Sequence, residues 1–351
     1  MRRETPGQKA AFCQGQHGRP ASNRPKAPII AVLAILAGAC VLFALKTPPR
    51  KVSKQWLALD TIVSVTIYDY KRFNDISSVD ILADCADIVS RYENLFSATI
   101  PGSDIYKLNR RQAETVDPRT YKLIEKSLYY SEKTGGLYDV TIAPVSALWD
   151  FEAASPALPD ETTLQTALLR VSSKNIELLP GNRVRLKNGA QIELGSIAKG
   201  FISDELAAFL ESRGVTGAII NLGGNVRAVG GKRGGAPFRI GVLNPFSADI
   251  AGYVEAAGVS VVTSGVYERS FYIDNKLYHH ILSPYTGYPI ESDLSSATIV
   301  AKSGTDADAL STCCILLGRK KALELAEGAG VQAVFITSDG EIVTTRKNPL
   351  H

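Results

Sequence analysis

An apolar run near the start of the chain limits where a folded domain can lie. Residues 27–45 are nineteen residues without a charged side chain, and a helix needs about 20 apolar residues to cross a bilayer. The run continues unbroken to Lys46, which makes it longer than the apolar core of a cleavable signal peptide. We therefore predict an uncleaved single-pass transmembrane anchor at 27–45, a basic cytoplasmic tail at 1–26 and a tether at 46–54.

Charge is distributed unevenly along the chain. Residues 1–54 contain ten Lys or Arg and one acidic residue, and the whole chain has a formal charge of +4, so the remainder carries about −5. Basic residues ahead of the apolar run favour a cytoplasmic N-terminus, which predicts a cell-membrane protein with its folded domain on the extracytoplasmic side. The stretch ending at Cys40 also resembles a lipoprotein processing site, so lipidation stays an alternative. The acidic body argues against a nucleic-acid partner.

The rest of the chain mixes helical and strand patterns. Thr61–Tyr68 alternates as a half-buried strand, and Ser78–Phe96 has a helical period. Further helices are expected at 119–134, 197–212 and 306–317, and short strands at 218–221, 238–243, 252–256, 270–273, 276–282, 333–336 and 341–345. Hairpin-linked strands interspersed with helices predict an α+β fold with mixed, mostly antiparallel sheets and packed helices, over residues 55–346.

Two glycine-containing segments are candidates for binding a phosphorylated ligand. Residues 135–141 (GGLYDVT) hold two glycines and Asp139, although taken by themselves they fit a helix C-cap followed by a loop better. Residues 193–200 (ELGSIAKG) precede a helix whose free N–H groups suit a phosphate, and Lys199 adds a positive charge. An ordinary capped helix is the alternative for the second segment.

Two later segments carry histidines and hydroxyl or carboxylate oxygens. His279 and His280 follow each other in an expected strand, so only one of them can enter a given site. Asp308 and Thr312 lie four apart on one helix face, and their oxygens suit Mg²⁺. A surface histidine and a solvent-facing aspartate are the structural alternatives.

Taken together and in this order, these segments resemble the ApbE family, the FAD:protein FMN transferases. The matching segments cover nearly the whole predicted domain: 59–66, 96–97, 102–104 with Asn109, 135–141, 193–200, 221–225 (NLGGN), 263–269 (TSGVYER), 279–289 (HHILSPYTGYP), 308–312 (DALST) and the terminal hairpin. The resemblance implies a Mg²⁺-dependent transfer of FMN from FAD to a Thr or Ser hydroxyl of an exported or membrane redox protein, with release of AMP.

The resemblance also assigns roles to individual residues. His280 matches the family's active-site histidine, and Asp308 could share its role as the base. The implied Mg²⁺ ligands are the side chains of Asp308 and Thr312 and the backbone carbonyls of Ser196 and Ser311. The positions that match the FAD site are Leu59, Leu137, Tyr138, Asp139, Glu193, Lys199, Gly223, Gly224 and Asn225.

Three positions depart from the family pattern. Ser283, Val266 and Glu193 stand where the family usually or often has Asp. Ser283 removes a carboxylate from the neighbourhood of His280, which leaves two alternatives open. One is an FAD pyrophosphatase that uses the same metal site with water as the nucleophile, and the other is a non-catalytic exported flavin-binding protein.

Overall fold

The computed structural model describes residues 51–70, 78–247 and 249–351. The predicted tail at 1–26, the predicted anchor at 27–45 and the first part of the tether lie outside the described residues. Within those described ranges, no helix has the length and apolar character that crossing a membrane requires. Strand β1 (Val52–Ala58) begins inside the predicted tether, because its residues pair with β2 from Val52 onward.

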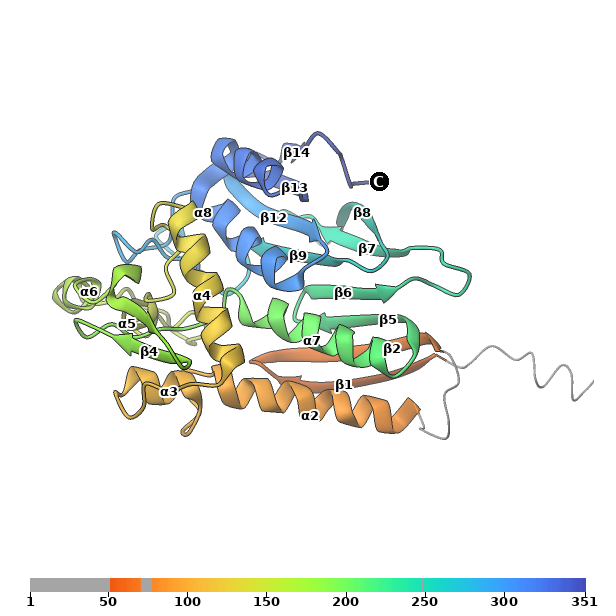
Figure 1. The fold of residues 1–351 in the computed structure, drawn as a ribbon. Helices are drawn as coiled ribbons and strands as arrows, with labels where there is room; N and C mark the ends of the chain where they lie inside the picture. Colours follow the sequence, from red (N-terminus) through yellow and green to blue (C-terminus); the bar gives the residue numbers. More distant parts are fainter. Residues whose placement is uncertain (1–50, 71–77, 248) are drawn as a thin grey trace, which may run out of the picture. The chain divides into compact units, whose positions relative to one another are not determined.

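A single large sheet organises the described part of the chain (Figure 1). Its eight strands lie in the order β1, β2, β5, β6, β9, β12, β13, β14, and every neighbouring pair is antiparallel. The strands after β1 are β2 (Thr61–Tyr70), β5 (Val215–Leu222), β6 (Asn225–Gly230), β9 (Ser260–Gly265), β12 (Leu294–Ala301), β13 (Gln332–Thr337) and β14 (Ile342–Thr344). The α+β prediction with mostly antiparallel strands is confirmed.

Three two-stranded hairpins are inserted between strands of this sheet. They are β3 (Ile176–Leu179) with β4 (Arg183–Leu186), β7 (Phe238–Leu243) with β8 (Ile250–Ala256), and β10 (Ser270–Ile273) with β11 (Lys276–His279). The last residues of the chain belong to the fold as well, since Tyr253 and His351 exchange backbone hydrogen bonds of 3.0 and 2.9 Å. The folded part therefore extends past the predicted end at residue 346.

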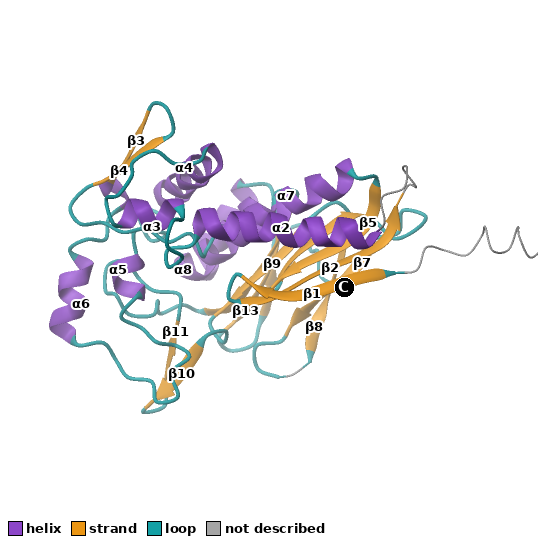
Figure 2. Ribbon diagram, turned by 90° about the horizontal axis from the view of Figure 1, so that it is seen from below, coloured by secondary structure: helices purple, strands orange, loops and turns teal. Residues whose placement is uncertain are grey.

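Helices cover one face of the large sheet, and the β7–β8 hairpin covers the other (Figure 2). The helices packed on the sheet are α2 (Ser78–Phe96), α7 (Ala198–Ser212) and α8 (Gly304–Gly328). The connection between β2 and β5 forms α3 (Asp104–Asn109), α4 (Pro118–Lys133), α5 (Ala143–Ser146), α6 (Glu161–Leu168), the 3₁₀ turn η1 (Ser173–Asn175) and the β3–β4 hairpin. This connection builds a second group of elements beside the sheet.

The alternation in β2 explains how the sheet is buried. Val63, Val65 and Ile67 are almost fully buried and join the main core under the helices. On the opposite face, Phe238 and Val254 of the β7–β8 hairpin form a smaller core with the central strands. Because β-branched side chains at alternate positions fit a half-buried sheet, this part of the fold follows from the sequence pattern.

Several expected elements differ from the structure. The helix expected at 306–317 begins at Gly304 and continues to Gly328, with a break at Gly318, where φ is 71°. The strand expected at 276–282 ends at His279, because the chain then bends. Strands β9 and β12 were not predicted, because neither alternates between apolar and polar residues. All residues of β12 are buried, so its sequence shows no period of two.

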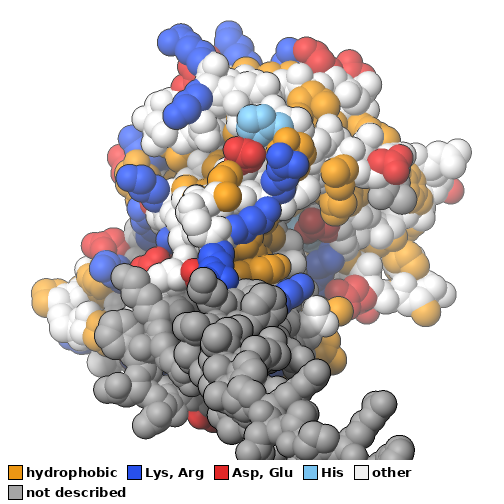
Figure 3. Space-filling view, turned by 90° about the vertical axis from the view of Figure 1, so that its right-hand side faces the viewer, with side chains coloured by type: hydrophobic (Ala, Val, Ile, Leu, Met, Phe, Trp, Pro, Cys, Tyr) orange, Lys and Arg blue, Asp and Glu red, His pale blue; other side chains and the backbone are white. Residues whose placement is uncertain are grey.

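On the face shown in Figure 3, basic, acidic and apolar side chains are interspersed over the described part of the chain. The exposed ion pairs of the structure include Glu114 with Arg183 and with Arg185, both at 2.7 Å. Such exposed pairs contribute little to stability, so the burial of apolar side chains dominates.

Helices α7 and α8 cross in close contact at Gly200. A Cβ atom on Gly200 would lie 2.6 Å from the carbonyl carbon of Gly304 and 2.7 Å from Cβ of Asp308. Asp204 of α7 also accepts the N–H groups of Gly304 (2.7 Å) and Thr305 (2.9 Å), which fixes the start of α8. The two helices are therefore locked in one relative position at their first turns.

We expect Gly200→Ala to destabilise the protein by about 1–3 kcal/mol, because the added methyl group must push the two helices apart. Gly328→Ala, at the end of α8, is the matched control, since a Cβ atom there would meet nothing within 4 Å. Urea unfolding followed by circular dichroism measures both changes. Equal free energies of unfolding for Gly200→Ala and the control would contradict the crossing described here.

Candidate active site

The buried carboxylate of Asp308 lies at the N-terminus of α7. Asp308 is only 5% exposed, and its Oδ2 accepts the backbone N–H of Gly200 at 2.8 Å. The first N–H groups of a helix lack partners within the helix, so Asp308 caps α7 from a neighbouring helix. Burial raises the pKa of Asp308, while the positive charge of Lys199 and the Gly200 N–H hold it down. This environment favours a ligand with positive charge next to the carboxylate.

Lys199 connects three segments that are far apart in sequence. Its Nζ lies 3.3 Å from the carbonyl oxygen of Gly195, where it donates a hydrogen bond. Its positive charge lowers the pKa of Asp308, of Glu268 and of His280, although burial is the larger influence on each of the three groups. The hydrogen bond from Gly200 to Asp308, the contacts of Ser264 with Ser311 and Thr312, and the pairing of Ser270 with His279 bring four segments together: 193–200, 263–269, 279–289 and 308–312.

His280 presents a buried ring nitrogen to this group. Its Nδ1 has no hydrogen-bond partner among the residues that the structure describes. Burial lowers the pKa of His280 to about 4, and the positive charges of Arg269 and Lys199 contribute. The imidazole is therefore neutral near pH 7 and can accept a proton or a hydrogen bond.

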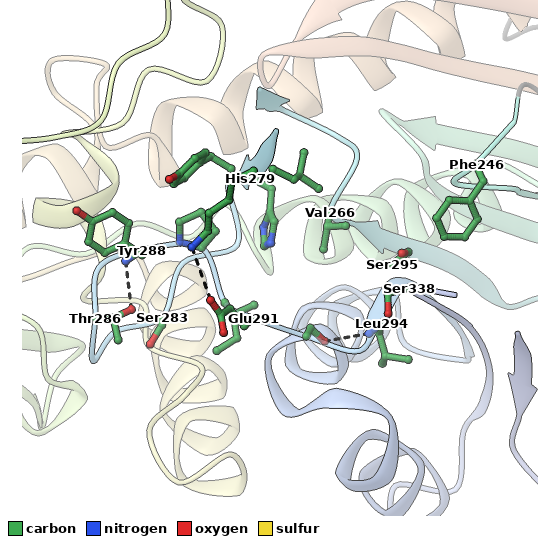
Figure 4. Close-up of a pocket in the computed structure, with 16 residues that line it drawn as sticks. Phe246, Val266, His279, Ser283, Thr286, Tyr288, Glu291, Leu294, Ser295 and Ser338 are labelled. Carbon is green, nitrogen blue, oxygen red and sulfur yellow. Dashed lines mark hydrogen bonds and ion pairs between the residues drawn. The ribbon is translucent and has the colours of Figure 1, made fainter. Parts of the chain in front are cut away.

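His279, the last residue of β11, has a different environment from His280, which follows the strand. It is 5% exposed, and its Nδ1 accepts the N–H of Ile281 at 3.3 Å. It lines a cavity of about 820 Å³ together with Val266, Ser283 and Tyr288 (Figure 4). His280 is not among the residues lining that cavity, so only one of the two histidines belongs to the charged group.

Ser283, the main departure from the family pattern, lines the cavity with His279 (Figure 4). Its Oγ accepts the N–H of Tyr285 at 3.3 Å, which caps the turn that follows. An aspartate at this position would accept the same kind of N–H group. The serine thus preserves the hydrogen bond that caps the turn, and it lines the cavity next to His279 and not the charged group around His280.

Three hydroxyl groups lie next to Asp308. Oγ of Ser264, in β9, is 2.7 Å from Oγ of Ser311 and 3.3 Å from Oγ1 of Thr312. Ser311 Oγ donates to the backbone carbonyl of Asp308 at 2.8 Å. The Ser311 hydroxyl group is therefore held by Asp308 and Ser264, whereas Thr312 is half-buried with its hydroxyl group beside Ser264.

The loop after α4 borders the start of α7. Tyr138 is buried, and its hydroxyl oxygen accepts a hydrogen bond from Ser196 Oγ at 2.8 Å. Leu137, beside it, is half-buried and packs against the main core. This contact joins two segments that were predicted to bind FAD.

Asp139 and Glu193 hold their loops together in the structure. Oδ1 of Asp139 accepts hydrogen bonds from N–H (2.8 Å) and Oγ1 (2.6 Å) of Thr141, and its Oδ2 accepts the N–H of Ser173 at 2.7 Å. Glu193 Oε2 accepts the Ser146 hydroxyl at 2.6 Å. Burial raises the pKa of both carboxyl groups. Both carboxylates therefore hydrogen-bond to neighbouring residues of the chain, and these bonds determine the shape of their loops.

Two tight turns lie together at the ends of β1, β2, β5 and β6. Leu59 has the left-handed φ of 55°, which is unusual for a residue other than Gly or Asn, and its N–H donates to Glu93 Oε1 at 2.7 Å. Gly223 approaches Thr61 so closely that a Cβ atom would lie 2.8 Å from Thr61 Cγ2. The predicted FAD residues Leu59, Gly223 and Gly224 therefore belong to one surface.

Asn225, the first residue of β6, places a buried amide beside Asp308. It is 2% exposed, and its interaction with Asp308 lowers the pKa of that carboxyl. Among the described residues, neither its Nδ2 nor its Oδ1 has a hydrogen-bond partner of normal geometry. Because buried polar atoms nearly always have partners in native proteins, the amide has capacity left for a polar ligand next to Asp308.

The predicted metal ligands fit a hard cation. Within the ranges that the structure describes, no group of three or more His, Cys, Asp or Glu side chains could hold a metal ion. The predicted set has a single such side chain, Asp308, with the Thr312 hydroxyl and the carbonyls of Ser196 and Ser311. Carboxylate, hydroxyl and carbonyl oxygens are the donors that Mg²⁺ accepts.

Three residues of this group had no role assigned from the sequence: Ser264, Glu268 and Arg269. All three lie in segment 263–269, which stood out as a motif. The contacts of Ser264 depend on the packing of β9 against α8, a long-range contact that no local pattern reveals. Arg269 has a φ of 31°, another unusual backbone conformation at this site.

Comparison with known proteins gives consistent matches. The model of the ApbE family matches residues 59–335. The FAD:protein FMN transferase of Treponema pallidum (strain Nichols) is 32% identical over 314 residues, which cover 84% of this chain and 86% of the relative.

Solved structures show the same similarity. The crystal structure of the ApbE protein of Thermotoga maritima has a TM-score of 0.77 and 32% identity, covering 85% of this chain and 97% of that one. The apo form of the Pseudomonas stutzeri flavinyl transferase ApbE has a TM-score of 0.74 and 26% identity, covering 85% and 95%. The chain therefore belongs to the ApbE family of FAD:protein FMN transferases.

Proposed function

We propose that this chain transfers FMN from FAD to the hydroxyl group of a Thr or Ser in an exported or membrane redox protein, and that the reaction depends on Mg²⁺. Family membership supports flavin transfer to a protein. The hydroxyl acceptor and the dependence on Mg²⁺ are supported by one observation: Asp308, Lys199 and His280 lie in one charged group at the N-terminus of α7.

The reaction is a phosphoryl-type transfer. The acceptor oxygen forms a bond to the phosphorus of the FMN half of FAD, the bond from that phosphorus to the bridging oxygen breaks, and AMP leaves with the electron pair. The proton of the acceptor hydroxyl moves to Nδ1 of His280, the unpartnered nitrogen. Asp308 is the alternative proton acceptor, at the expense of its role as a ligand.

Charge on the diphosphate of FAD must be balanced for this transfer to occur. The positive charge of Lys199 and the positive end of the α7 helix dipole would attract the diphosphate oxygens. A Mg²⁺ ion held by Asp308, Thr312 and the carbonyls of Ser196 and Ser311 would neutralise further negative charge. The surface of Leu59, Gly223 and Gly224 and the Leu137–Asp139 loop would flank the rest of FAD.

We also propose that residues 27–45 anchor the chain in the cell membrane with the enzyme domain outside the cytoplasm. The uncharged run of nineteen residues supports this location. An anchor concentrates the enzyme near membrane-bound acceptors. Lipidation at Cys40 would have the same effect.

We expect Asp308→Asn to reduce FMN transfer by at least about 100-fold, because the neutral amide cannot bind the cation or balance its charge. The full chain in detergent is incubated with FAD, Mg²⁺ and exported proteins of its host. AMP is measured by chromatography, and FMN on Thr or Ser by mass spectrometry. Asp84→Asn, which changes an exposed carboxylate of α2, is the control.

The products distinguish the alternatives. AMP together with an FMN adduct on a Thr or Ser supports the transferase. AMP with free FMN and unmodified proteins would contradict it in favour of a pyrophosphatase. Tight FAD binding without AMP would show a binding protein.

The pH dependence tests the role of His280. Its pKa of about 4 lies below the ordinary value of 6.5, so the imidazole stays neutral as the pH falls from 8 to 5. We therefore expect the acidic fall in kcat/KM near pH 4 to 5. A fall centred near pH 6.5, in protein that circular dichroism shows to be folded, would argue against a buried neutral His280.

A further inference from the structure

The hydroxyl groups of Thr312, Ser264 and Ser311 form a chain that ends on the backbone of Asp308. The Oγ1 to Oγ distance from Thr312 to Ser264 is 3.3 Å, and the Oγ to Oγ distance from Ser264 to Ser311 is 2.7 Å. The last link, from Ser311 Oγ to the carbonyl oxygen of Asp308, is 2.8 Å. Ser264 comes from β9, whereas the other three groups belong to α8.

The direction of every hydrogen bond in this chain can be assigned. A hydroxyl group has one proton to donate, and a carbonyl oxygen can only accept. Ser311 therefore uses its proton on Asp308, so its oxygen must accept the proton of Ser264. The proton of Ser264 is then used as well, and the contact with Thr312 requires Thr312 to be the donor.

This assignment fixes the orientation of the Thr312 hydroxyl group. Its proton is directed at Ser264, so its lone pairs are directed away from Ser264. A threonine inside a helix otherwise tends to donate to the carbonyl four residues earlier, which for Thr312 is the carbonyl of Asp308. That carbonyl already accepts Ser311. Ser264 thus supplies the alternative acceptor.

We propose that Ser264 is a positioning residue that accepts the Thr312 proton and thereby presents the Thr312 oxygen to a divalent cation beside Asp308. This inference rests on the proposed function, because it concerns the same cation site. Groups that orient metal ligands through hydrogen bonds typically change metal affinity by about 10- to 100-fold when removed. Ser264 is expected to act in this way without touching the cation.

The neighbouring residue provides a matched control. Thr263 Oγ1 forms a hydrogen bond of 2.8 Å with Thr298 Oγ1, on the face of β9 opposite to Ser264. Thr263→Val removes a hydroxyl group from the same strand and leaves the chain of Ser264, Ser311 and Thr312 intact. It therefore controls for the loss of any strand hydroxyl group.

The test measures Mn²⁺ binding to the full-length protein by electron paramagnetic resonance of the free ion. We expect Ser264→Ala to weaken Mn²⁺ binding by roughly 10-fold or more. Ser264→Thr, which keeps the hydroxyl group, should restore binding, and Thr263→Val should leave it unchanged. In AMP-release assays, Ser264→Ala should raise the Mg²⁺ concentration needed for half-maximal rate more than it lowers the rate at saturating Mg²⁺.

Ser264→Ala that binds Mn²⁺ within twofold of the natural protein would overturn the proposal. If that variant does not fold, Ser264→Cys replaces it, because the thiol has a similar shape and is a weaker acceptor, and it must then weaken binding as well. Asp308→Asn separates this inference from the proposed function. Mn²⁺ binding that is insensitive to Asp308→Asn contradicts the cation site itself, whereas binding that needs Asp308 and ignores Ser264 contradicts only the positioning role.

Discussion

The contact between the first turns of α7 and α8 determines the geometry of the whole site. Gly200 and Gly304 let the two helices approach closely, and this approach brings the Asp308 carboxylate to the Gly200 N–H. Any side chain at residue 200 would displace Asp308 from the end of α7. The positions of Lys199 and Thr312 depend on the same contact, because each lies on one of these helices within four residues of Gly200 or Asp308.

The buried carboxylate is the electrostatic centre of this arrangement. Burying an unpaired carboxylate costs several kcal/mol, so its partners must offset that cost. The Gly200 N–H, the positive end of α7 and Lys199 do so in part, yet burial still raises the pKa of Asp308. The remaining imbalance favours a bound cation, and the buried amide of Asn225 beside Asp308 favours polar ligand atoms at this place.

The sequence predicted elements with regular local patterns and missed contacts that depend on packing. The alternation of Val63, Val65 and Ile67 and the helical period of 78–96 were sufficient for β2 and α2. Strand β12 is buried along its whole length and shows no alternation. The segments of the site were identified because the family resemblance covers them in order. The role of Ser264 could not be predicted, since it depends on β9 lying beside α8.

We propose that Asp308 and Thr312 hold a divalent cation against FAD, with His280 nearby as the proton acceptor. A crystal of the natural protein soaked with Mn²⁺ and FAD, measured at the manganese absorption edge, tests this arrangement directly. We expect an anomalous peak within coordination distance of Asp308 and of Thr312 Oγ1, with the FAD diphosphate beside it and beside His280. A peak elsewhere, or FAD bound with no peak near Asp308, would show that the cation site is wrong.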